Sequence, residues 1–156
     1  MMNVRSVLAP AIIWAAMAST LPAAPLDWPE PIVNGLALLQ QGRVKEAVQA
    51  WSKGSSWTNQ QEFIKSTTMV LGVEPVAKGP LNRVENVASA SLAPSVSLYW
   101  IALIYERGVH YLWFEVLAHE NAHVITAMSR YDDVRELGAS LALFPERLVG
   151  YSESQK

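Results

Sequence analysis

The stretch VSLYWIALIYE at residues 96–106 decides the fold of this chain. β-Branched and aromatic side chains dominate it, and turn signals bound it at residues 93–95 and 107–108, so it predicts a strand. Side chains alternate between the two faces of a strand. Residues of one face are Leu98, Trp100, Ala102 and Ile104, and those of the other are Tyr99, Ile101, Leu103 and Tyr105. Both faces are apolar, so this strand must be covered on both sides.

Three similar runs surround this strand and predict a four-stranded antiparallel meander. They lie at Leu81–Leu92, Val109–His119 and Ala122–Tyr131. Pro94 marks the first turn, Gly108 the second, and Glu120-Asn121 the third.

The segment before the sheet has the apolar periodicity of helices. We expect three helices, from Ile32 to Gly42, from Val44 to Gly54 and from Thr58 to Gly72. Thr58 and Gln61 have the spacing of a capping box at the start of the third helix, and Val73–Pro80 is expected to break the pattern. After the sheet, Val134–Leu143 predicts a short final helix.

These elements predict a single α+β domain over residues 32–144, in which the N-terminal helices pack on one face of a curved four-stranded antiparallel sheet. The second apolar face would need the closing curl of the sheet, a ligand or a second subunit. Residues 145–156 are expected to form a C-terminal tail.

The start of the chain resembles a cleavable secretory signal. Arg5 is followed by the apolar run Val7–Ala18, which ends in the cleavage pattern Ala16-Met17-Ala18. This run is shorter than the roughly 20 residues that cross a bilayer, so we expect no stable membrane anchor. Residues 1–18 are therefore predicted to be removed, with residues 19–31 as an extended, proline-rich lead-in. The protein is expected to be periplasmic or secreted.

Composition excludes several classes of function. The chain has 12 Lys and Arg against 14 Asp and Glu, a formal net charge of −2, and it has no basic block or glycine-rich phosphate loop. We therefore expect no nucleic-acid partner. It also has no cysteine, which excludes disulfides, thiol catalysis and thiolate zinc sites.

One sharp motif allows two interpretations, because residues 119–123 (HENAH) satisfy H-E-x-x-H. On a helix, His119 and His123 would bind one zinc ion and Glu120 would act as general base, as in a secreted zinc metallopeptidase. On a hairpin turning at Glu120-Asn121, His119 is opposite Ala122 and points away from the face of His123. The strand-forming residues before the motif favour the hairpin, and the metallopeptidase with zinc remains the alternative.

The order of the elements resembles the small exported bacterial proteins of the NTF2-like superfamily. The features that carry the resemblance are the helices followed by a meander with Tyr105-Glu106-Arg107-Gly108, the aromatic pair Trp113-Phe114, and a last strand ending in Tyr131-Asp132-Asp133. The resemblance extends from Ile32 to Leu137. It implies a cone-shaped fold with a pocket between sheet and helices, often in homodimers, but no single activity, because members include isomerases, dehydratases, transport factors and binding domains.

We therefore expect a domain that binds a small molecule or an envelope protein through its pocket or its sheet, with no cofactor, and that can form a homodimer through the sheet. The residues expected to line a ligand site are Tyr99, Trp100, Tyr105, Trp113 and Glu115. If the protein were an isomerase or dehydratase, Glu115 or Glu85 would be the carboxylate that acts with a histidine or tyrosine partner.

Overall fold

The structure is a computed structural model, which describes residues 28–142 and 148–149. The predicted signal peptide and most of the lead-in and tail lie outside these residues. The helices are α1 (Glu30–Gln40), α2 (Val44–Ser52), α3 (Gln61–Lys78) and α4 (Val134–Ala142). The strands are β1 (Leu81–Ala93), β2 (Val96–Tyr105), β3 (Gly108–His119), β4 (Ala122–Tyr131) and β5 (Leu148–Val149).

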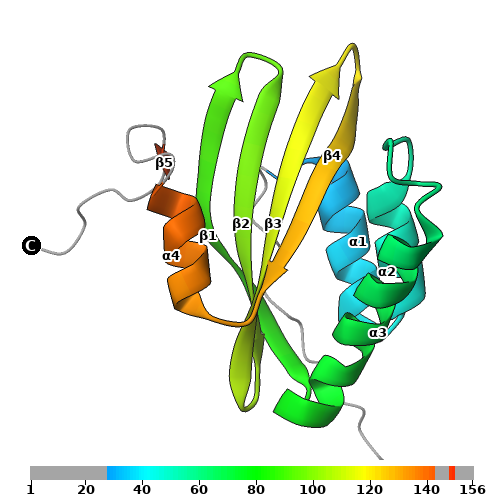
Figure 1. Cartoon of the computed structure of the whole chain (residues 1–156), viewed down its shortest axis with the longest axis vertical. Helices are drawn as coiled ribbons and strands as arrows, with labels where there is room; N and C mark the ends of the chain where they lie inside the picture. Colours follow the sequence, from blue (N-terminus) through cyan, green and yellow to red (C-terminus); the bar gives the residue numbers. More distant parts are fainter. Residues whose placement is uncertain (1–27, 143–147, 150–156) are drawn as a thin grey trace, which may run out of the picture.

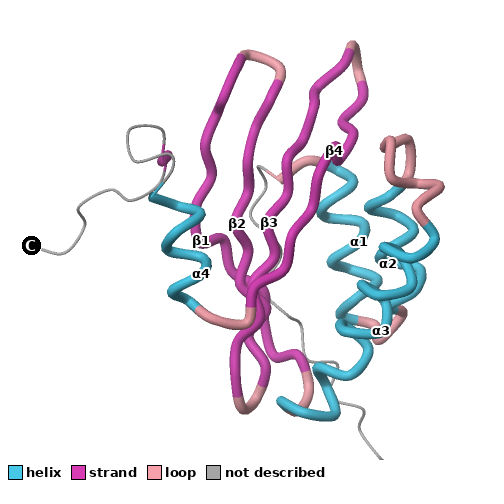
Figure 2. Tube along the Cα trace, viewed as in Figure 1, coloured by secondary structure: helices cyan, strands magenta, loops and turns pink. Residues whose placement is uncertain are grey.

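The strands form one open, twisted sheet in the order β4-β3-β2-β1-β5 (Figures 1 and 2). The prediction of an α+β fold with four antiparallel strands is confirmed, and the main strands begin and end within one residue of their predicted limits. The structure adds β5, in the segment expected to be a tail, which pairs with Ser89 and Ala90 of β1.

Helices α1, α2 and α3 cover the face of the sheet that carries Ile101 and Leu103 of β2 and Phe114 of β3. Trp51 of α2 is fully buried there, and its ring lies 5.3 Å from that of Phe114. Gly35 of α1 makes room for this indole, because a Cβ at position 35 would lie 1.9 Å from the Trp51 Nε1. A glycine therefore allows the two helices and the sheet to meet.

The opposite face of the sheet is covered in part by α4 (Figure 1). Leu137 of α4 is 2% exposed and packs with Leu98 and Trp100 of β2 in a second apolar cluster. The predicted final helix thus supplies cover for the face that was expected to need sheet closure, a ligand or a subunit. Within residues 28–142, no helix is both long enough and apolar enough to cross a membrane.

The predicted limits of the helices are wrong at three places, one of which is the start of α3 at Gln61 instead of Thr58. The helix α1 begins at Glu30, inside the segment expected to be extended, because proline is favourable in a first helical turn and Pro31 lies there. The helix α3 does not end at Gly72 but continues through Pro75 to Lys78. Contacts of Glu74 and Lys78 with the sheet hold this last part in place.

The predicted capping box is also wrong. No side chain caps the start of α3, and the Thr58 hydroxyl donates instead to the carbonyl of Ser52. Gly79 ends α3 with a φ of +82°, and its N–H donates to the carbonyl of Pro75 at 3.0 Å. The true stop signal is therefore Gly79 and not Gly72.

Candidate functional site

A groove of about 460 Å³ opens between the α1–α2 pair and the β3–β4 turn. Three separate elements supply its polar side chains: Glu30 and Asn34 from α1, Lys53 from the end of α2, and Asn121 and His123 from the hairpin. The remaining lining residues are Pro31, Ala50, Gly54 and Ala122. Polar groups from three elements therefore line one hollow.

Opposite charges line this groove without pairing. The carboxylate of Glu30 accepts a hydrogen bond from the Asn34 amide at 3.2 Å. Among residues 28–142, neither Glu30 nor Lys53 has an oppositely charged group within 4.0 Å, so the two charges do not neutralise each other. His123 likewise has no polar partner in the part of the chain that the structure describes.

The β3–β4 hairpin sends its two histidines in different directions. His119 is opposite Ala122 and His123 is opposite Ala118, so the two imidazoles lie on opposite faces of the hairpin. His123 shares its face with Ile125, on the side of the helices, and reaches the groove. The helix that the zinc metallopeptidase requires is not formed here, and Glu120 lies in the turn with a φ of +53°.

The residues expected to line one ligand site lie on both faces of the sheet. Tyr99 and Tyr105 pack with the helices, whereas Trp100 and Trp113 face each other across β2 and β3 on the side of α4. Glu115 is also on that side, and its Oε1 accepts a hydrogen bond from Thr126 at 2.6 Å. The structure thus brings Trp100 and Trp113 together but does not gather the five residues into one pocket.

Glu85, the other carboxylate considered for catalysis, lies on β1. Its side chain is half exposed and its Oε1 is 2.5 Å from Nε of Arg83. No histidine or tyrosine among the described residues is hydrogen-bonded to Glu85, which is instead in a surface ion pair.

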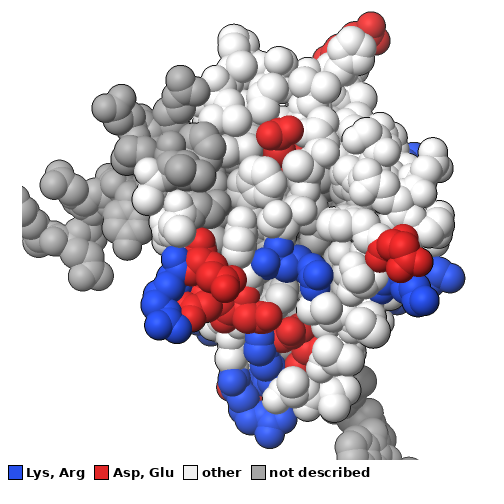
Figure 3. Space-filling view, in the orientation of Figure 1, with Lys and Arg blue, Asp and Glu red and all other residues white. Residues whose placement is uncertain are grey.

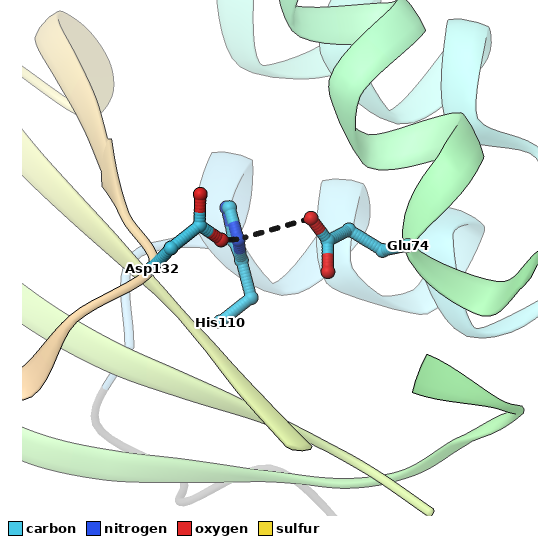
Figure 4. A group of neighbouring side chains, drawn as sticks. All are labelled: Glu74, His110 and Asp132. Atoms are coloured by element: carbon cyan, nitrogen blue, oxygen red, sulfur yellow. Dashed lines mark hydrogen bonds and ion pairs between the residues drawn. The ribbon is translucent and has the colours of Figure 1, made fainter. Parts of the chain in front are cut away.

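A second polar site lies at the other end of the helix–sheet interface, where Glu74 of α3, His110 of β3 and Asp132 after β4 converge (Figure 4). His110 Nδ1 is 2.7 Å from Asp132 Oδ1 and 3.5 Å from Glu74 Oε1. His110 is 1% exposed, whereas Asp132 is at the surface. Figure 3 shows charged side chains gathered on this lower part of the molecule and an almost uncharged surface above it.

The partners of His110 define its protonation. Both groups near Nδ1 are carboxylates, so Nδ1 carries the hydrogen and donates it. Nε2 is buried and has no hydrogen-bond partner. Burial lowers the pKa of His110, although the neighbouring carboxylates act in the opposite direction. The charged form would also leave an Nε2–H without an acceptor, which agrees with a neutral imidazole.

Lys78 joins the two carboxylates. Its Nζ lies 2.7 Å from Glu74 Oε2 and 3.2 Å from Asp132 Oδ1, and it donates to the carbonyl of Val109 at 3.1 Å. Burial acts against the charged ammonium, but the hydrogen bonds to the two carboxylates outweigh it and raise the pKa of Lys78. Burial and the charge of Glu74 also raise the pKa of the nearby Tyr105.

The three residues around His110 offer one nitrogen and two oxygen atoms within 4.8 Å, a set that could hold a metal ion. The ammonium of Lys78 already contacts both carboxylates, however, and a metal ion would have to displace it. Asp132 likewise retains its charge: partial burial acts to raise the pKa of Asp132, but hydrogen bonds from His110 and Lys78 lower it. Ion pairs and hydrogen bonds among Glu74, Lys78, His110 and Asp132 therefore connect α3 to the sheet.

Sequence reasoning named His123 of the groove only as an alternative zinc ligand and missed the other residues of both sites. Glu30 was placed in an extended segment, and Glu74 in an expected break. For His110, one sequence pattern was informative. His110 alternates with Leu112 and Phe114 on a strand face that had to be buried, so its side chain needed a polar partner. No local pattern identifies that partner.

No family model, curated protein or solved structure matches this chain. Its function must therefore be argued from the chemistry of its own sites.

Proposed function

We propose that this chain is an exported binding domain that holds a small polar ligand in the groove lined by Glu30, Asn34, Lys53 and His123. The observation that carries the proposal is the convergence of these side chains, from three elements, on one hollow. A concave site with a few convergent polar groups is the usual form of a small-molecule site, and about 460 Å³ is within the size range of such sites.

We further propose that the domain is a member of the NTF2-like superfamily. The order of three helices followed by an antiparallel meander supports this proposal. A groove at the junction of helices and sheet also agrees with the pocket that the resemblance implies. Export is supported by the basic residue, apolar run and cleavage pattern at residues 1–18.

The proposal is tested by titrating the isotope-labelled protein with a panel of small polar compounds: glycine, glutamate, citrate, phosphate and glucose. We expect at least one of them to shift the backbone amide signals of Asn34, Lys53 and His123 in a saturable manner. If no compound shifts these signals, or if the shifts gather elsewhere, the proposal is wrong.

The hairpin supplies a matched pair of variants. His123→Ala should weaken binding of the active compound, because it removes a side chain that lines the groove. His119→Ala should leave binding unchanged, because His119 lies on the opposite face of the same hairpin. Equal effects of the two substitutions would contradict a site in the groove.

A further inference from the structure

We infer that the ligand of this groove is a zwitterion, namely an α-amino acid or a short peptide with a free ammonium and a free carboxylate. The inference rests on the proposed function and narrows its ligand class. It follows from the two opposite charges of Glu30 and Lys53, which line one hollow and remain more than 4.0 Å apart.

The negative side of the groove is prepared to hold an ammonium group. Asn34, one helical turn after Glu30, donates its amide to Oε1 at 3.2 Å and so orients the carboxylate. Among the described residues, Oε2 has no hydrogen-bond partner and is open to a ligand. Glu30 also lies in the first turn of α1, where the helix dipole favours a negative charge. The carboxylate is therefore available to a ligand ammonium.

The positive side is formed by Lys53, which follows α2, and by His123 of β4. The three donors of the Lys53 ammonium are not used by another described residue. A ligand carboxylate can accept from this ammonium and from the His123 imidazole. The amide of Asn121 at the turn provides a further donor and acceptor at the same side.

Other ligand classes fit this distribution of charge less well. A simple anion would pair with Lys53 but would leave the charge of the nearby Glu30 carboxylate uncompensated. A simple cation would pair with Glu30 but would leave the charge of the Lys53 ammonium uncompensated. A neutral sugar would use neither charge. Only a ligand with both charges satisfies both sides, and such complementarity also excludes ligands of the wrong charge.

The test compares four small compounds by calorimetric or NMR titration. Glycine carries both charges, N-acetylglycine only the negative charge and glycinamide only the positive charge, and dialanine serves as the short peptide. We expect glycine or dialanine to bind at least tenfold more tightly than both singly charged compounds. Whether glycine or dialanine binds more tightly shows whether the ligand is a free amino acid or a peptide.

Substitutions of two exposed residues test whether Glu30 binds the ammonium end of the ligand and Lys53 its carboxylate end. Glu30→Gln should weaken the zwitterion at least tenfold without weakening N-acetylglycine, whereas Lys53→Met should weaken the zwitterion without weakening glycinamide. Thermal unfolding of both variants checks that the fold is intact.

The failure of this inference is distinguishable from failure of the proposed function. If N-acetylglycine or glycinamide binds the groove as tightly as glycine and dialanine, or if only citrate, phosphate or glucose binds there, the ligand is not a zwitterion but the binding function stands. If nothing binds in the groove, both proposals are wrong.

Discussion

Nδ1 of His110 lies 2.7 Å from Oδ1 of Asp132, which joins the start of β3 to the segment after β4. Lys78 and Glu74 connect the same contact to the last turn of α3. The lower end of the molecule is thus held by ion pairs and hydrogen bonds, whereas the middle of the helix–sheet interface is apolar.

The protonation of His110 predicts a loss of stability in mild acid. The pKa of His110 is lowered in the folded state, so below its ordinary value of about 6.5 the unfolded chain binds more protons than the folded chain. The free energy of unfolding should therefore fall as the pH decreases from about 7 to 5. Urea unfolding at several pH values measures this slope.

Two variants test whether the pH dependence of the free energy of unfolding comes from His110 or from His119. His110→Gln keeps a side-chain N–H for Asp132 but cannot titrate, so the slope above pH 5 should become smaller. His119→Gln should retain the slope, because His119 is exposed on the hairpin. An unchanged slope in His110→Gln would contradict the protonation that we assign.

The ion pair between Lys78 and Glu74 predicts that substitutions of these two residues have non-additive effects on the free energy of unfolding. Lys78→Met should lower the free energy of unfolding by about 3 kcal/mol, because it leaves the buried Glu74 carboxylate without its cation. The double variant with Glu74→Leu should be more stable than Lys78→Met alone. Chemical unfolding of the wild type, both single variants and the double variant tests the coupling, and additive losses would show that the ion pair has no such role.

Gly35 predicts a steric effect. Gly35→Ala should destabilise the protein by about 1–3 kcal/mol, because the new Cβ would overlap the buried indole of Trp51. Gly72→Ala is the matched control, since a Cβ there would meet nothing within 4 Å. That substitution should stabilise α3 by up to about 1 kcal/mol. Thermal unfolding should move in opposite directions for the two variants.

The turn at Glu120 predicts a stabilising substitution. Glu120 has a φ of +53°, which is costly for a residue with a Cβ, so Glu120→Gly should stabilise the protein by up to about 1 kcal/mol. In a helical H-E-x-x-H motif, the same change would destabilise by a similar amount. The sign of the change in melting temperature therefore distinguishes the hairpin from the helix.

Helix α3 shows why sequence periodicity failed in one region. It buries Thr67, Leu71 and Glu74 and exposes Met69 and Val76, so its apolar residues lie on both sides and no single stripe is visible. Pro75 and Gly72 added local signals for a break. The contacts of Glu74 and Lys78 with the sheet outweigh these signals, and such contacts are not encoded locally.

The sequence by itself determined the four long strands, the alternation of Trp100 and Ile101 between two faces, and the turn that separates His119 from His123. These features depend on periodicity and turn chemistry within a few residues. Only the tertiary structure decided that Glu30 and Lys53 share a groove and that Glu74 meets His110. The proximity of residues so distant in sequence depends on the twist of the sheet and on how the helices cross it, which no local pattern of residues specifies.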